Sequence, residues 1–134
     1  MASNLKYSNG TRDAQQQGLI TYAGSNALIN IYSGTQPANA NTAISTQTLL
    51  VSLPISGSFG TDSNGPITLS SVTSANATAT GTATFFRIFK SDGTTVVMDG
   101  SVGTSGADMN LDNTSIATGQ TVTITSGTII RANQ

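Results

Sequence analysis

With 134 residues, of which 37% are apolar and 8% charged, the chain fits one domain with a single core. Its net charge is −1 and its basic residues are scattered, which argues against nucleic-acid binding, and it has no cysteine or histidine for a disulfide framework or a zinc site. No apolar run approaches the roughly 20 residues that span a bilayer, and the first residues lack the apolar stretch of a secretory signal. We therefore expect neither nucleic acid nor membrane as a partner.

The amino-terminal part of the chain predicts an arm followed by a helix. Residues 1–10 are polar and predict an extended, flexible arm. A short helix is predicted over 12–23, with Thr11 as its N-cap and Gly24 after its last residue. One apolar stripe would pack at helical spacing: Leu19, Ile20 and Ala23. The alternative is a strand over 18–24, because a glycine inside a helix costs about 1 kcal/mol relative to alanine.

From residue 26 onwards the chain is rich in β-branched residues and alternates between apolar and polar positions, which predicts strands. Asp92-Gly93 predicts a tight hairpin turn. The strands are expected within 26–34, 48–59, 66–74, 76–90, 94–103, 105–119 and 120–132. This spacing predicts a mainly β fold: an antiparallel β-sandwich of jelly-roll or Greek-key type, with roughly 7–8 strands and a short N-terminal helix, forming a single domain over 11–134.

The end of the strand predicted over 76–90 carries large apolar side chains on both faces. Phe86 and Ile88 would enter the core, together with Val96, Met98, Val122 and Ile124. Phe85 and Phe89 would lie on the other face with Arg87 between them. Either the helix or a long loop of the same chain covers this face, or another subunit does.

Aromatic and arginine side chains are enriched at protein interfaces, so this second face is a candidate contact surface. The polar arm is expected to become ordered on binding and to add contacts. The candidate interface residues are Phe85, Arg87, Phe89, Lys6 and Tyr7.

Neither a metal site nor a catalytic site is predicted. The stretch from Asp108 to Asn113 offers oxygen ligands of the kind that calcium binds, but it lacks the spacing and the glycine of an EF-hand loop. Aspartates in a polar stretch are more often turn formers. An enzyme without histidine would need a pair of aspartates at a workable separation. We expect no catalytic residue, no metal and no cofactor.

Three segments resemble a group of small virion proteins of tailed bacteriophages. They are IYSGTQPA at 31–38, GTATFFRI at 81–88 and DGSVGTSGADMNL at 99–111, in which Ser101 stands where the pattern often carries an acid. The resemblance covers roughly residues 17–130. It implies a structural component of the particle and brings no catalytic residues with it.

The resemblance and the charge-poor, threonine-rich composition together predict a capsid decoration or cement protein that stabilises the head by bridging major capsid subunits. Its expected partners are the major capsid protein and copies of itself in a homo-oligomer. It would be made in the host bacterial cytoplasm and reside on the capsid surface of the virion. The alternatives are a tail or fibre component, such as an adaptor or a receptor- or glycan-binding module, and an enzyme such as a cell-wall hydrolase.

Overall fold

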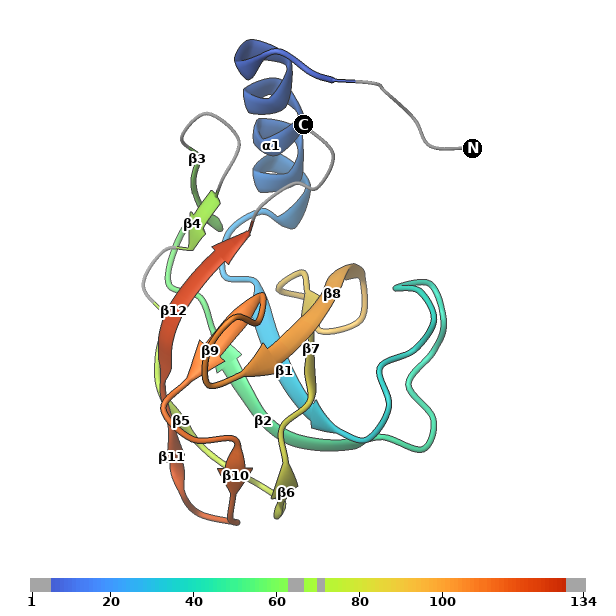
Figure 1. Cartoon of the computed structure of the whole chain (residues 1–134), viewed down its shortest axis with the longest axis vertical. Helices are drawn as coiled ribbons and strands as arrows, with labels where there is room; N and C mark the ends of the chain where they lie inside the picture. The colour runs from blue at the N-terminus through green and yellow to red at the C-terminus, as the bar shows by residue number, and fades with distance from the viewer. Residues whose placement is uncertain (1–5, 63–66, 70–71, 130–134) are drawn as a thin grey trace.

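The computed structural model describes residues 6–62, 67–69 and 72–129. Within these residues the fold is mainly β with one helix, α1 (Asn9–Ala23), as predicted (Figure 1). The strands are β1 (Leu28–Ser33), β2 (Thr48–Pro54), β3 (Gly60–Asp62), β4 (Ile67–Leu69), β5 (Ala75–Asn76), β6 (Gly81–Thr82), β7 (Phe85–Phe89), β8 (Val96–Gly103), β9 (Met109–Leu111), β10 (Ser115–Ile116), β11 (Thr121–Val122) and β12 (Ile124–Ile129).

Local capping decides where α1 begins and ends. The hydroxyl of Ser8 accepts a hydrogen bond from the backbone N–H of Thr11 at 3.1 Å, so Ser8 is the N-cap. The predicted cap at Thr11 is therefore wrong, and the helix starts inside the range 1–10 that was expected to be an arm. Gly24 follows the last helical residue with a φ of 72°, as the sequence predicts. The alternative of a strand over 18–24 is wrong.

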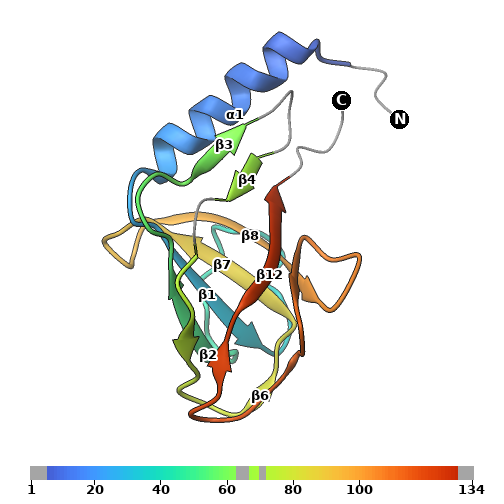
Figure 2. The same cartoon turned by 90° about the vertical axis from the view of Figure 1, so that its left-hand side faces the viewer.

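The apolar stripe of α1 packs as its spacing predicts. Ala23 is buried, and Leu19 and Ile20 are partly buried against the core. The helix lies along β3 at one end of the molecule (Figure 2). Its last turn is also held by Lys90, whose Nζ lies 3.9 Å from the centre of the Tyr22 ring. The described residues contain one helix, α1, and it is neither long nor apolar enough to cross a membrane.

Replacing Gly18 with alanine is expected to stabilise the protein by about 0.5–1 kcal/mol. Gly18 lies in the middle of α1 with its surface exposed, and a Cβ there meets nothing within 4 Å. Urea denaturation of the Gly18→Ala variant measures the gain. A loss of stability would show that α1 does not pack as described.

The strands form one curled sheet in the order β2-β1-β7-β8-β9-β12-β4-β3, with β10-β6 and β11-β5 as short additional pairs. The segment containing β5 runs between β2 and β11. On one side, the N–H groups of Thr73 and Thr78 donate to Pro54 and Leu50 of β2, at 2.9 and 2.8 Å. On the other side, β5 pairs with β11. The sheet therefore wraps around its own core (Figures 1 and 2).

The strand boundaries differ from the sequence prediction where the chain changes neighbours. The strand predicted over 76–90 is divided into β5, β6 and β7, because these pair in turn with β11, with β10, and with β1 and β8. The last predicted strand is divided into β11 and β12, and β3 lies in a predicted loop. The pairing is also not entirely antiparallel, because β8 and β9 run parallel.

The core lies on the concave side of the curled sheet. Phe86, Ile88 and Val122 are buried there, as predicted, and Met98 and Ile124 are partly buried against them. Val96 is not part of this core. A β-bulge between Ile88 and Phe89 places Val96 opposite Phe89, on the other face of the sheet. Val97 packs against the core instead.

Candidate functional site

The candidate site is the outer face of β1, β7 and β8, which points away from the core. Register defines it: Tyr32 lies opposite Phe85, and Arg87 lies opposite both Asn30 on β1 and Asp99 on β8. Side chains alternate along a strand, so these residues share one face while Phe86 and Ile88 share the other. We call this surface the outer face.

A buried ion pair forms the centre of the outer face. Nε and Nη2 of Arg87 donate to Oδ1 and Oδ2 of Asp99 at 2.6 and 2.8 Å, which is a bidentate pair. The two side chains are only 2% and 5% exposed. The hydrogen bond to the Asp99 carboxylate raises the pKa of Arg87, although burial acts in the opposite direction. Sequence reasoning found Arg87 but missed Asp99 as its partner.

Two stacked aromatic rings lie beside the ion pair. The rings of Tyr32 and Phe85 are 5.2 Å apart and inclined by 13°. The amide nitrogen of Asn30 lies 3.4 Å from the Tyr32 hydroxyl, while the amide oxygen of Asn30 is buried without a partner. The outer face therefore combines apolar rings with a charged pair, and both are removed from water.

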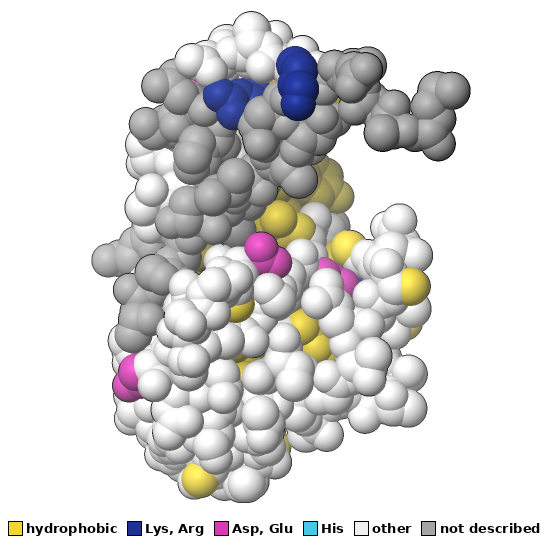
Figure 3. Space-filling view, in the orientation of Figure 1, with side chains coloured by type: hydrophobic (Ala, Val, Ile, Leu, Met, Phe, Trp, Pro, Cys, Tyr) yellow, Lys and Arg dark blue, Asp and Glu magenta, His cyan; other side chains and the backbone are white. Residues whose placement is uncertain are grey.

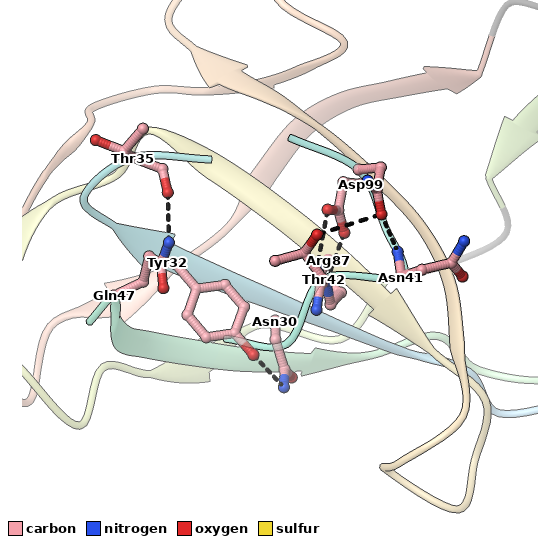
Figure 4. Close-up of polar contacts among 9 residues, drawn as sticks. Asn30, Tyr32, Thr35, Asn41, Thr42, Gln47, Arg87 and Asp99 are labelled. Atoms are coloured by element: carbon pink, nitrogen blue, oxygen red, sulfur yellow. Dashed lines mark hydrogen bonds and ion pairs between the residues drawn. The ribbon is translucent and has the colours of Figure 1, made fainter. Parts of the chain in front are cut away.

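A loop of the same chain covers this face. The loop over residues 34–47 joins β1 to β2, and we call it the covering loop. Figure 1 shows it beside β7 and β8, and the turned view of Figure 2 shows it behind the sheet, on the outer side. Figure 4 shows Asn41 and Thr42 of this loop in the same region as Arg87 and Asp99, on the side where Figures 1 and 2 place the loop. Phe85 is 0% exposed within the single chain, so the chain itself covers this ring.

The covering loop is shaped by its own polar groups. The Asn39 side-chain oxygen accepts from the N–H of Asn41 at 3.0 Å and lies 3.3 Å from the Thr42 hydroxyl. The Gln47 side chain closes the base, because its amide nitrogen donates to the carbonyl of Thr35 at 2.6 Å (Figure 4). The hydroxyl of Thr84, just before β7, donates to the carbonyl of Gly34 at 2.6 Å.

The structure does not gather the candidate interface residues on one exposed surface. Phe85 and Arg87 are 0% and 2% exposed, so neither side chain is open to another subunit in the single folded chain. Phe89 is partly buried. Lys6 is exposed and Tyr7 partly buried, but both precede the end of α1 that points away from β7 (Figure 1).

In the stretch from Asp108 to Asn113, which offers oxygen ligands of the kind that calcium binds, the carboxylate of Asp108 contacts the chain's own Ser101. Oδ2 of Asp108 accepts from the N–H of Ser101 at 2.9 Å and from its hydroxyl at 3.2 Å. The Ser101 hydroxyl in turn accepts from the N–H of Asp108 at 3.1 Å. This exchange holds β9 beside β8. In the described part of the chain, no group of three or more acidic side chains is placed to hold a metal ion.

Replacing Ser101 with aspartate is expected to destabilise the protein by roughly 1 kcal/mol at pH 7, because a hydrogen bond to Asp108 is lost and two carboxylates then face each other. The repulsion acts only while both carboxylates are charged, so the added loss is present at neutral pH and smaller at acidic pH. Denaturation at pH 7 and pH 4 measures it, with Ser101→Asn as the uncharged control. An equal loss at both pH values would contradict this account.

Asp92 shapes the turn between β7 and β8. Its carboxylate accepts from the N–H groups of Thr94 and Thr95, both at 2.8 Å, and from the Thr95 hydroxyl at 2.6 Å. These hydrogen bonds, that of the Thr95 hydroxyl above all, lower the pKa of Asp92 from 3.8 to about 2. The turn is therefore stabilised by ionised Asp92 above the unfolded pKa, and this contribution disappears as the pH falls through the folded pKa.

An NMR titration of the Asp92 carboxyl is expected to have its midpoint near a pKa of about 2. In a Thr95→Val variant the midpoint should move up toward 3.8, because the strongest donor is removed. A wild-type midpoint already at the ordinary value would mean that the turn does not hold these hydrogen bonds in solution.

Comparison with known proteins finds no match to this chain among family models, curated proteins or solved structures.

Proposed function

We propose that this protein is a structural component of a tailed-bacteriophage virion, and specifically a capsid decoration protein that stabilises the head by bridging neighbouring major capsid subunits. The main support for this proposal is where the three segments that resemble virion proteins lie in the sheet. The three segments that resemble virion proteins, 31–38, 81–88 and 99–111, contain β6 and β9 and overlap parts of β1, β7 and β8, and β1, β7, β8 and β9 are consecutive neighbours in the sheet.

These segments also supply the contacts of the outer face. Tyr32 comes from the first segment, Phe85 and Arg87 come from the second, and Asp99 comes from the third. Ser101 and Asp108, which join β8 to β9, belong to the third as well. The resemblance therefore lies on residues that support one another physically, which favours a shared fold over a chance match of polar, glycine-rich sequence.

The surface is suited to extended protein contacts. On the described part of the face in Figure 3, charged side chains are sparse, and uncharged side chains and backbone make up most of it. Short hydroxyl side chains lose little conformational entropy when a partner fixes them, and they do not repel a partner by charge. Many such contacts repeated over a shell would add up to stable attachment.

Three of the six aspartates that an enzyme would depend on are engaged in structural bonds. Asp99 pairs with Arg87, Asp108 binds Ser101, and Asp92 binds the turn of the β7–β8 hairpin. These bonds favour a structural role over a hydrolytic one.

We also propose that the curled sheet is a β-sandwich. One layer would hold β2, β1, β7 and β8, and the other β9, β12, β4 and β3, in the order in which they pair. Ile29, Leu53 and Phe86 of the first layer belong to the same buried cluster as Ile67, Met109 and Leu111 of the second. A measured structure with the two layers packed face to face would support this description.

The test of the function is to locate the chain in purified particles of a phage that encodes it. An antibody raised against the purified chain should appear on the heads in immunogold electron microscopy, and mass spectrometry should find the chain in mature particles. Labelling confined to tails or fibres would support the alternative of a tail component. Absence of the chain from mature particles would rule out both proposals.

A further inference from the structure

The covering loop is attached to the sheet mainly through its two ends. The hydroxyl of Thr84 binds the carbonyl of Gly34, and the Gln47 side chain binds Thr35 across the base. Within the described residues, the hydrogen bonds of 35–46 join the loop to itself or to Gln47. A loop of this length without regular structure is uncommon in a compact domain and is often functional.

Closure of the loop is only weakly favoured by the groups that it brings together. The apolar side chains of the loop that are partly buried are Pro37, Ala40 and Ile44, and most of the others are exposed. The covered surface includes the Arg87–Asp99 pair, and removing a charged pair from water opposes closure. The gain comes from shielding the rings of Tyr32 and Phe85.

At Gly34, where the covering loop begins, the backbone changes direction sharply. Gly34 has a φ of 98°, which other residues adopt rarely, and Gln47 lies directly beside it. The sheet beneath has its own support, because β7 pairs with β1 on one side and with β8 on the other. The loop can therefore move without breaking the strand pairing under it.

We propose that the covering loop is a strap that swings away about Gly34 and Gln47 and uncovers the outer face while the sheet stays folded. Closed, it keeps two aromatic rings and an ion pair out of water. Open, it presents Tyr32, Phe85 and Arg87 on the surface. The inference concerns this chain alone and does not depend on the proposed function.

Thiol labelling tests the strap, because the chain contains no cysteine and each introduced thiol is unique. Phe85→Cys places the thiol on the outer face, and Ile88→Cys places it on the core face of the same strand, with both wild-type side chains fully buried. After correction for each variant's own unfolding free energy, Phe85→Cys should react at least about tenfold faster than Ile88→Cys, since local opening requires less free energy than global unfolding.

A second substitution links this reaction to the strap. Adding Gln47→Ala removes the bond to Thr35 and should increase the corrected labelling rate of Phe85→Cys while leaving that of Ile88→Cys unchanged. Equal corrected rates for the two thiols would overturn the proposal, because labelling would then require the whole domain to unfold.

Hydroxyl-radical oxidation of the unmodified chain gives an independent measurement that needs no core substitution. Phe85 and Phe59 are both 0% exposed, but Phe85 lies on the outer face opposite Tyr32, whereas Phe59 belongs to the core cluster. Tyr22, which is 50% exposed, serves as the reference for full reactivity. Phe85 should be oxidised measurably while Phe59 remains protected. Equal protection of the two rings would also overturn the proposal.

Discussion

An Arg87→Met variant is expected to lose about 3–5 kcal/mol of its free energy of unfolding, because the Asp99 carboxylate is left buried without its partner. Methionine retains much of the length and apolar contact of the arginine stem, so the loss reports mainly the broken pair. Urea denaturation of wild type and variant measures the difference. A cost of this size is a large fraction of the stability of an ordinary domain.

Two controls separate the ion pair from simple loss of packing. The double variant Arg87→Met, Asp99→Leu should recover most of the loss, since no unpaired charge remains buried. The single variant should also lose less at acidic pH, where a buried carboxyl that binds a proton no longer carries a charge. A loss below about 1 kcal/mol, typical of an exposed pair, would show that the carboxylate of Asp99 reaches water, as opening of the strap would allow.

A Gly100→Ala variant is expected to lose about 1–3 kcal/mol through overpacking of the core. A Cβ at this position would lie closer to Cζ of Phe86 than real Cβ atoms come, and 3.1 Å from Oδ2 of Asp108. Phe86 is 1% exposed and packed within the core, so its ring has little room to withdraw. The requirement for glycine here is one of space, since Gly100 is not among the residues with positive φ.

A double-mutant cycle with Phe86→Leu tests the cause. Leucine removes the end of the ring that the new methyl group meets, so Gly100→Ala should cost less in that background. The Gly18→Ala variant supplies the matched contrast, because the same substitution in open space on α1 should stabilise the protein. If Gly100→Ala costs the same with either residue at position 86, the contact between Phe86 and Gly100 is not its cause.

The features that the sequence predicts correctly each depend on residues that lie close together in the chain. The apolar stripe of Leu19, Ile20 and Ala23 indicates the packed face of α1, and Gly24 indicates its end. The alternation along Phe85 to Phe89 indicates which side chains share a face. Each of these signals depends on backbone geometry that repeats within a few residues, so a single sequence is enough to show it.

Arg87 pairs with Asp99 because the pairing of β7 with β8 is irregular. Uninterrupted pairing back from the turn at Asp92 and Gly93 places Arg87 opposite Met98, and nothing in the sequence marks an exception. The β-bulge between Ile88 and Phe89 shifts the register by one residue and brings Asp99 opposite Arg87. One inserted residue thus decides whether a buried arginine meets a thioether or a carboxylate.

The sequence by itself determined that this chain is mainly β with one helix and that β7 carries large side chains on both faces. Only the tertiary structure decided that the second face is covered by the chain's own loop over 34–47 and that Phe85 and Arg87 are buried. The physical reason is how far apart in the sequence the interacting residues lie. Strand alternation follows from neighbouring backbone angles, whereas covering a face depends on many weak contacts between segments distant in the sequence, which no local pattern records.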